Sequence, residues 1–426
     1  MTQTPQSSHA ETSSAPAAAS GWLQAPQPRL GTVGLVLLLS AANIICPLSL
    51  DMYTPAVPFL PEQFNTTASV VNLTISGFYL FFSLGMLLFG PVCDRTGRKP
   101  VLVGGLAAFA AGSVLCAAAW SIEALIAFRL IQATGAGAVC AVSTAIVKDC
   151  FTPERRTALL TILQVIMVIG PVMAPLLGGV ILMFSTWHTT FLVLAAVGAV
   201  CIALSLLYRE SLPAQDRVTG GMGNTFARMG AVAKNRGFAT LLLIASLFSV
   251  PFMAYVSVAS YVYTGHFGTS TQGYTYFFAA TAALSVLGPL LYLRASRTGV
   301  SARRFTHGVI VVGLLASLAL LVAGQANVFA FFACLAVFAL LEASIRPYTT
   351  NILLAQNERD AGSASALINF AVNIFGVVGM GLVSLFSVQD YAFGLGVLML
   401  GSMVAVAALW VYLLTSRKAH IKELEA

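Results

Sequence analysis

Long apolar stretches alternate with short polar segments along almost the whole chain. A helix needs about 20 consecutive apolar residues to cross the hydrocarbon core of a bilayer, which is the approximate length of these stretches. Twelve of them are predicted, at residues 32–57, 70–92, 100–119, 123–147, 157–183, 187–208, 238–264, 274–294, 305–323, 328–355, 362–388 and 391–415. The pattern predicts an all-α integral membrane protein with twelve transmembrane helices.

The polar connections divide these helices into two groups of six. The longest internal connection covers residues 209–237 and contains three closely spaced glycines, which is typical of a linker. We expect one six-helix bundle over residues 29–208 and a second over residues 238–416. Residues 1–28 are rich in Ser, Thr, Ala, Pro and Gln and are predicted to be disordered. Residues 417–426 form a short tail.

The composition excludes a water-soluble protein, because only 9% of the residues are charged and 58% are hydrophobic. A soluble domain carries about 25% charged residues. The net charge of +7 is scattered over short loops, so it does not indicate nucleic-acid binding. The seven cysteines form no CxxC pair, and the histidines show no metal-ligand spacing. We expect no disulfide framework, no metal and no cofactor.

The basic residues define the expected topology. Apart from Arg129 and Arg346, which lie inside predicted helices, every Lys and Arg falls near a terminus or in one alternate set of loops. Loops that face the cytoplasm carry an excess of Lys and Arg. Both termini are therefore predicted to lie in the cytoplasm.

The loop after the second predicted helix has a distinctive sequence, GPVCDRTGRKPVL, at residues 90–102. Its glycines permit close approach or unusual backbone angles, and its acid can pair with an Arg or lie at a helix N-terminus. The sequence is similar to the loop 2–3 signature of the major facilitator superfamily, although an ordinary basic loop is the alternative. The resemblance implies a latch between the two bundles, formed by Gly90, Asp94, Arg95, Gly97, Arg98 and Lys99.

The loop after the eighth helix, GPLLYLRASRTGVSARR, partly repeats this sequence. Both loops begin with Gly-Pro and contain Arg-Thr-Gly, but Ser296 stands where the first copy has Asp94. This weak internal repeat is consistent with two bundles related by a parallel repeat.

The fifth predicted helix contains GPVMAPLLGG at residues 170–179. Gly170, Ala174 and Gly178 recur every four residues on one face, which permits close helix contact. The two prolines remove backbone donors and can bend the helix. The pattern resembles an antiporter motif of the same superfamily and favours export, whereas a general packing seam is the alternative. The motif residues are Gly170, Pro171, Pro175, Gly178 and Gly179.

The first predicted helix contains an acidic residue, Asp51, in the segment LSLDMYTPAVP. A charge in the middle of a membrane helix costs about 2.5–3.5 kcal/mol on insertion scales, so such residues are usually functional. A carboxyl that gains and loses a proton is what a proton-coupled carrier requires. The segment resembles the bicyclomycin-resistance (Bcr/CflA) branch of drug:proton antiporters, which implies that Asp51 is a proton and substrate site. An interfacial or capping carboxylate is the alternative.

Two more charged sites lie inside predicted helices. Arg129 and Gln132 belong to RLIQATGAG in the fourth helix, whose spacing matches a superfamily motif implicated in proton coupling. We expect Arg129 to face the central cavity and to approach Asp51 or hold a polar network; snorkelling to the outer interface is the alternative. In the tenth helix, Glu342 and Arg346 are four residues apart and can meet on one face. They form either a structural pair or a second proton or substrate site.

Further cavity candidates are polar or aromatic residues, because sites for lipophilic molecules are apolar with a few polar groups. They are Asn43, Tyr53, Tyr79, Gln132 and Tyr255. Together these features predict a major facilitator carrier that exports drug-like molecules in exchange for protons by alternating access. It is expected to work as a monomer in the bacterial inner membrane, with protons, a small-molecule substrate and lipid as its partners. The alternative is an exporter or proton symporter of one metabolite; an enzyme and a passive channel are disfavoured.

Overall fold

The computed structural model describes residues 23–25, 27–217, 222–356, 361–416 and 421, and helices dominate these ranges. Eleven helical segments among them are long and apolar enough to cross a membrane. A further helix, α6, contains the shorter apolar stretch Ile169–Phe184 within its 32 residues. The predicted all-α membrane fold is confirmed, and the helix count agrees with twelve crossings.

The helices follow one another with short connections, as the apolar pattern predicts. Their bounds are α1 (Gly31–Asp51), α2 (Leu60–Gln63), α3 (Ala68–Thr96), α4 (Arg98–Ala117), α5 (Ile122–Cys150), α6 (Pro153–Phe184), α7 (Trp187–Leu207), α8 (Met222–Ala233), α9 (Arg236–Tyr261), α10 (Thr271–Ser285), α11 (Leu287–Arg297), α12 (Ala302–Val322), α13 (Val328–Ala355), α14 (Ala361–Val383) and α15 (Tyr391–Thr415). Short 3₁₀ turns cover Thr54–Phe59 (η1), Ala214–Asp216 (η2) and Val388–Asp390 (η5), and a π-helical turn covers Val262–His266 (η3).

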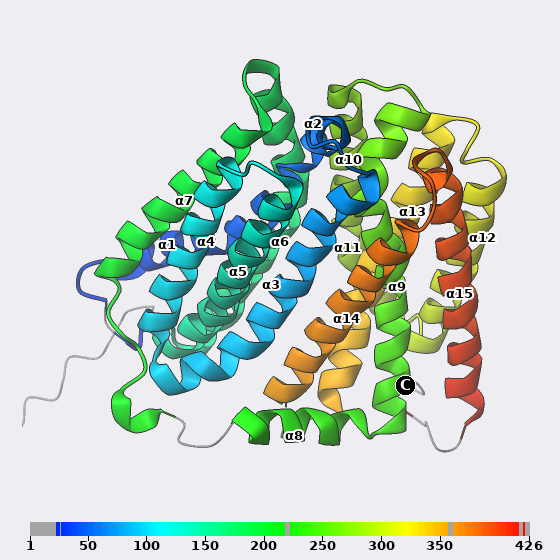
Figure 1. The fold of residues 1–426 in the computed structure, drawn as a ribbon. Coiled ribbons are helices and arrows are strands. Elements are labelled where there is room, and N and C mark those ends of the chain that lie inside the picture. The colour runs from blue at the N-terminus through cyan, green and yellow to red at the C-terminus, as the bar shows by residue number, and fades with distance from the viewer. Residues whose placement is uncertain (1–22, 26, 218–221, 357–360, 417–420, 422–426) are drawn as a thin grey trace, which may run out of the picture.

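Figure 1 shows α1 to α7 on one side of the molecule and α9 to α15 on the other. The short helix α8 lies across one end of the structure, and α2 lies at the opposite end. We call these the basic end and the α2 end, because the basic end carries Arg95, Lys148, Arg236 and Arg294 at or near the termini of long helices. The predicted domain limits at residues 29–208 and 238–416 stay predictions.

The same helix pairs pack through glycine in both groups. A methyl group on Gly178 of α6 would overlap the carbonyl oxygen of Met52, which lies just beyond α1. In the second group, a methyl group on Gly379 of α14 would overlap the carbonyl oxygen of Val250 on α9. Gly85 of α3 lies against α5, and Gly288 of α11 lies against α13 in the same way. The close approaches therefore join the first helix to the fifth and the second to the fourth in each group of six, which agrees with the weak sequence repeat.

Three features of the chain differ from the simple pattern. The eighth span is broken at Val286 into α10 and α11, three residues before Pro289, which lacks the backbone N–H that a continuous helix requires. The connection 209–237 contains an additional helix, α8. Gln24 hydrogen-bonds the Lys148 carbonyl oxygen near the end of α5, and Gln27 hydrogen-bonds that of Arg209, two residues beyond α7. Ordered chain therefore begins before residue 29. Residues 1–22 and 26 of the predicted disordered segment lie outside the described residues.

Side-chain hydrogen bonds join the two groups of helices at the α2 end. Four such bonds have both partners among the described residues. The Tyr274 hydroxyl donates to Thr54 Oγ1 over 2.9 Å, and the Ser69 hydroxyl donates to the Ser384 carbonyl oxygen over 2.9 Å. The α2 end is therefore closed by contacts between α3 and α14 and between the end of α1 and α10.

Candidate transport site

Arg129 lies fully buried on α5, where it holds a polar network. Its Nη1 donates to the Ser49 carbonyl oxygen and to Gln132 Oε1, both over 2.8 Å, and its Nε donates to the Thr74 carbonyl oxygen over 3.3 Å. Gln132 Nε2 in turn donates to the Ser113 hydroxyl over 2.8 Å. The structure thus favours the predicted polar network over snorkelling, because the side chain has no exposed surface.

The end of α1 provides a carbonyl group that accepts a hydrogen bond from Arg129. The last carbonyl groups of a helix have no partner within it, and the helix dipole places negative partial charge there. Ser49 lies in the last turn of α1, so its carbonyl oxygen can accept from the guanidinium. A cation buried at this point is stabilised by the helix terminus, and no carboxylate lies within ion-pair distance of it among the described residues.

Three aromatic rings complete the surroundings of Arg129. Its guanidinium carbon lies 4.3 Å from the ring centre of Phe78, 5.3 Å from that of Tyr53 and 5.6 Å from that of Phe191. Cation–π contacts contribute about 2 kcal/mol or more when desolvated. Nη2 remains buried without a hydrogen-bond partner among the described residues. The site therefore holds a positive charge on aromatic faces and carbonyl oxygens.

Asp51 is the last residue of α1 and is only 3% exposed. Its side chain makes no hydrogen bond and no ion pair with any residue that the structure describes. Its carbonyl oxygen instead accepts from the Thr54 hydroxyl over 2.8 Å, because Pro55 cannot donate a backbone N–H there. Asp51 lies within electrostatic range of Arg129, but the two residues are not paired. The structure thus places this carboxyl inside the bundle and leaves it unpaired.

The predicted cavity candidates divide into two kinds. Three candidates are buried and hydrogen-bonded: Asn43, Tyr53 and Tyr255. Asn43 donates to the Leu39 carbonyl oxygen on its own helix. Tyr53 shares a hydrogen bond with Thr74, and Tyr255 donates to Thr281. Gln132 belongs to the Arg129 network. Tyr79 on α3 is only half-buried. Of the five candidates, Tyr79 alone is partly exposed.

Glu342 and Arg346 meet on α13, as their spacing predicts. Arg346 Nε lies 3.5 Å from Glu342 Oε1. The Glu342 side chain is 9% exposed, whereas that of Arg346 is 49% exposed. The acid therefore faces the protein and the cation faces accessible space.

The glycine face of α6 packs directly on the segment that carries Asp51. A methyl group on Gly170 would overlap the Pro47 ring, and one on Gly178 would overlap the Met52 carbonyl oxygen. Ala174, between them, is fully buried. Pro171 and Pro175 lie within the same uninterrupted helix, and a methyl group on Gly179 would lie 3.1 Å from Thr275 Oγ1 on α10. This face therefore fixes the backbone on both sides of Asp51.

The predicted latch loop holds a network within the first group of helices. Gly97 is the single residue between α3 and α4, and its φ of 105° favours glycine. Arg98 binds Asp94 over 2.5 Å and Asp149 of α5 over 2.7 Å. Lys99 Nζ donates to the Leu206 carbonyl oxygen over 2.8 Å, and Arg95 is half-buried. These contacts join the ends of α3, α4, α5 and α7.

Two acidic residues of this network were missed from the sequence. Asp149 binds Arg98, and Glu210 accepts hydrogen bonds from the backbone N–H groups of Arg98 and Lys99 over 2.9 and 3.0 Å. Glu210 thus caps the N-terminus of α4. A position at a helix N-terminus was one of two roles expected for Asp94 from the sequence. The sequence indicated that Gly90 allows close approach or an unusual backbone angle. Neither occurs at Gly90 in this structure, because a methyl group there would have no neighbour within 4 Å and its φ is not positive.

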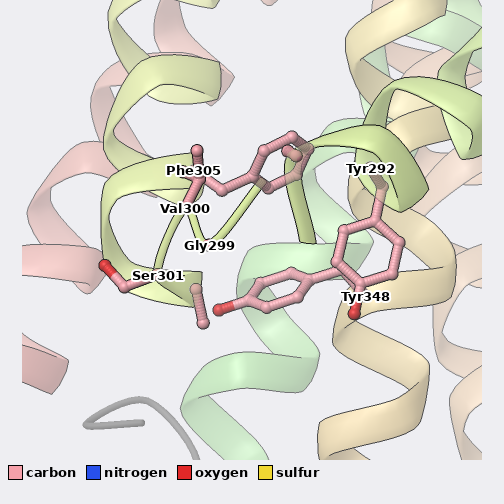
Figure 2. A pocket seen from close by; sticks show the side chains of 8 residues that line it. Tyr292, Gly299, Val300, Ser301, Phe305 and Tyr348 are labelled. Atoms are coloured by element: carbon pink, nitrogen blue, oxygen red, sulfur yellow. The ribbon is translucent and has the colours of Figure 1, made fainter. Parts of the chain in front are cut away.

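A separate pocket of about 280 Å³ lies where α11 joins α12, near the basic end. Figure 2 shows the rings of Tyr292, Phe305 and Tyr348 lining it. Their ring centres are 5.6 to 6.0 Å apart. None of the predicted site residues lines this pocket, so it is distinct from the region around Asp51 and Arg129.

The architecture and these motifs agree with a comparison against known families. Residues 39–379 match the Major Facilitator Superfamily. The chain belongs to this superfamily. It is therefore a multi-pass membrane transporter and not an enzyme, as the sequence predicted.

Bacterial members of the superfamily resemble this transporter in sequence. An uncharacterized MFS-type transporter of Bacillus subtilis, YdgK, is 29% identical over 358 residues, which cover 83% of this chain and 89% of that protein. A chloramphenicol resistance protein of Pseudomonas aeruginosa is 34% identical over 260 residues, 61% of each chain. The multidrug resistance protein MdtL of Escherichia coli is 29% identical over 247 residues, 58% of this chain and 62% of its own length. The match spans less than two thirds of the two resistance proteins.

Solved transporters share the fold of this superfamily member. A peptide transporter of the POT type, crystallised with sulfate, superposes with a TM-score of 0.74 at 14% identity, covering 94% of this chain and 98% of that one. A bacterial homologue of the human lysosomal transporter Spinster, in an inward-facing and occupied conformation, gives a TM-score of 0.69 at 16% identity, covering 92% and 97%. At these identities the likeness concerns the fold alone.

Proposed function

We propose that this transporter is a proton-coupled efflux antiporter of the bacterial inner membrane, of the Bcr/CflA type. It exports drug-like molecules by alternating access between two six-helix bundles, acts as a monomer, and keeps both termini in the cytoplasm. The resistance proteins among its relatives support export of drugs. The segment DMYTPAVP and the loop at residues 90–102 support the Bcr/CflA type.

The unpaired carboxyl of Asp51 carries this proposal. A charged carboxylate inside a membrane protein is costly unless it is paired, and the structure offers Asp51 no hydrogen bond or ion pair among the described residues. Such a group is well suited to exist in a neutral, protonated form in one state and a charged form in another. Asp51 is therefore the proton carrier of the cycle.

Arg129 makes the charge of Asp51 depend on the conformation. The guanidinium is fixed by Ser49, Thr74 and Gln132, and Ser49 lies two residues before Asp51 on the same helix. A shift of the end of α1 against α5 changes the distance between the cation and the carboxyl. This change alters the proton affinity of Asp51 as the transporter switches sides.

Exchange requires that proton and substrate oppose each other's binding. In the outward state Asp51 takes a proton and substrate leaves; in the inward state the proton leaves and substrate binds. One charge moving through 100 mV supplies about 2.3 kcal/mol. The gradient thus drives export.

Everted membrane vesicles test this function. Vesicles from cells that make the transporter, and from matched cells that do not, are energised so that their interior becomes acidic and positive. We expect the transporter vesicles to accumulate radiolabelled chloramphenicol or other labelled drugs, and to release them when nigericin and valinomycin collapse the gradient. Accumulation that survives this collapse would show that protons are not the energy source.

A further inference from the structure

Two tyrosines of the second group of helices donate hydrogen bonds to the segment that follows α1. The Tyr274 hydroxyl on α10 donates to Thr54 Oγ1 over 2.9 Å, and the Tyr261 hydroxyl on α9 donates to the Val57 carbonyl oxygen over 3.3 Å. Both tyrosines and both of their partners are buried. The second group of helices therefore holds η1, which begins three residues after Asp51, inside the closed α2 end.

The bond from Tyr274 continues to the residue that carries the buried carboxyl. The Thr54 hydroxyl accepts from Tyr274 and donates its own proton to the Asp51 carbonyl oxygen over 2.8 Å. A hydroxyl has one proton to donate, so Tyr274 must be the donor in its bond with Thr54. Among the described residues, the other three side-chain bonds between the two groups of helices do not reach Asp51.

The Asp51 carbonyl oxygen depends on Thr54 for its donor. In a continuous helix this oxygen would accept from the backbone N–H four residues later, but that residue is Pro55, which has none. A buried carbonyl group without a donor is costly. The Thr54 hydroxyl supplies the missing donor, so the geometry of the turn at Asp51 depends on where Thr54 lies.

Helices from both groups meet at this turn. Gly178 of α6 lies against the Met52 carbonyl oxygen, and a methyl group on the next residue, Gly179, would lie 3.1 Å from Thr275 Oγ1 on α10. Thr275 directly follows Tyr274. The turn is thus packed against α6 of the first group and bonded to α10 of the second. Opening of the α2 end moves the two groups apart, so it breaks the bond from Tyr274.

We propose that Tyr274, acting through Thr54, couples opening of the α2 end to the position of Asp51. While this end is closed, the bond fixes Thr54 and with it the turn that carries the carboxyl. When the end opens, Tyr274 leaves with the second group of helices, and the turn moves relative to the guanidinium of Arg129. Tyr274 is a positioning residue, because it acts on Asp51 only through Thr54. The inference rests on the proposed proton exchange and adds how that exchange is tied to the conformation.

A bond that only helps to close the α2 end predicts different behaviour. Its loss would change how often the end opens, as would loss of the bond from Ser69 to the Ser384 carbonyl oxygen, which has the same length of 2.9 Å. Tyr274→Phe and Ser69→Ala would then alter transport alike. A coupling bond instead predicts that drug still crosses the membrane in Tyr274→Phe but that its movement is no longer tied to protons.

Proteoliposomes that contain the purified transporter separate these cases with radiolabelled chloramphenicol. Two initial rates are measured in the same preparation: uptake driven by an imposed proton gradient, and exchange of labelled for unlabelled drug without a gradient. The ratio of the first rate to the second reports coupling, whereas loss of folded protein lowers both rates together. Tyr274→Phe is compared with Ser69→Ala and with Tyr276→Phe, the same substitution at a 66% exposed position of α10.

We expect Tyr274→Phe to lower this ratio about 5-fold, the change in an equilibrium that the loss of one hydrogen bond of ordinary strength produces. Thr54→Val should lower it at least as much, because both bonds of the hydroxyl are lost. Thr54→Ser keeps the hydroxyl and should keep the wild-type ratio. Ser69→Ala and Tyr276→Phe should also keep that ratio.

A wild-type ratio in Tyr274→Phe overturns the proposal, and so does an equal fall in Tyr274→Phe and Ser69→Ala. If Tyr274→Phe does not fold, the two Thr54 variants decide, and equal ratios in Thr54→Ser and Thr54→Val overturn the proposal. Failure of the proposed proton exchange is a separate result, because wild type itself would then exchange drug without gradient-driven uptake. The two failures are therefore distinguishable.

Discussion

The guanidinium carbon of Arg129 lies 4.3 Å from the ring centre of Phe78, so this buried cation rests on an aromatic face. Its other partners are uncharged: two backbone carbonyl oxygens and the amide of Gln132. Burying a cation without a carboxylate is costly, and here hydrogen bonds from Nη1 and Nε and the aromatic rings offset part of that cost, whereas Nη2 has no hydrogen-bond partner among the described residues. The arrangement leaves Asp51 without an ion pair among the described residues, as the proposed proton exchange requires.

Replacement of Arg129 by lysine should therefore fail. A lysine keeps the charge but lacks the planar guanidinium, in which Nη1 binds Ser49 and Gln132 while Nε binds Thr74. Its compact ammonium cannot occupy both positions or lie flat on the Phe78 ring. Each lost hydrogen bond to the charge is worth about 1.5–3 kcal/mol. We expect proton-driven transport to fall at least about 10-fold and the melting temperature of the purified protein to drop, as measured in proteoliposomes and by thermal unfolding.

Phe78→Leu is the matched control for this variant. It leaves the hydrogen-bond partners of Arg129 in place and removes one of the three ring contacts, that of Phe78, together with the stacking of Phe78 on Phe82. Its effect should be smaller than that of Arg129→Lys. Equal activity of Arg129→Lys and wild type would contradict the role assigned to the network.

Asp51→Asn should separate coupling from binding. Asparagine has nearly the shape of a protonated aspartate but cannot release a proton. We expect gradient-driven accumulation of chloramphenicol to be lost while exchange of labelled for unlabelled drug across the membrane continues. Measurement of both in the same proteoliposomes, with Asp51→Glu as the variant that keeps a carboxyl, checks the prediction. Wild-type accumulation by Asp51→Asn would remove Asp51 from the mechanism.

The charged residues of the candidate site could be picked out from the sequence because a charge in an apolar stretch is conspicuous. Asp51, Arg129 and the Glu342–Arg346 pair were found in this way, and the pair meets as its spacing requires. What the sequence left open was the partner of Arg129. That partner is the carbonyl group of Ser49, which becomes available only where α1 ends, so no side-chain pattern marks it.

Asp149 and Glu210, which bind residues of the loop at positions 90–102, could not be predicted from the sequence either. Asp149 and Glu210 lie in polar segments rich in charge, where one more acid has no distinctive pattern. Their contacts with Arg98 join residues 51 and 112 positions apart. Local spacing predicts helices and i, i+4 pairs, whereas these contacts depend on how α4, α5 and the end of α7 come together.

Gly178→Ala should distort the segment that carries Asp51. The added methyl group overlaps the Met52 carbonyl oxygen, a backbone atom that cannot move alone. Overpacking of this kind costs about 1–3 kcal/mol. We expect lower thermal stability and reduced proton-driven transport. Gly104→Ala on α4 is the control, because its methyl group has no neighbour within 4 Å; similar losses in both variants would argue against a specific contact between α6 and the end of α1.

Gly97→Ala should disrupt the junction of α3 and α4 for two independent reasons. The φ of 105° is unfavourable for any residue with a Cβ atom, at a cost of about 1–3 kcal/mol. The methyl group would also lie 2.6 Å from Glu210 Oε2, which caps α4. Glu210→Gln removes the charge of the cap but keeps the backbone unstrained, so it should be milder. Thermal unfolding and proton-driven uptake of drug into everted vesicles measure these effects.

Gly90→Ala provides the control within the same loop signature. Gly90 has an ordinary helical backbone and open space at the position of a methyl group, so this variant should match wild type in stability and transport. The expected order of damage is Gly97→Ala first, Glu210→Gln second and Gly90→Ala none. If Gly90→Ala is as damaging as Gly97→Ala, then the loop acts through a contact made in another conformation, and the strain at Gly97 does not explain its importance.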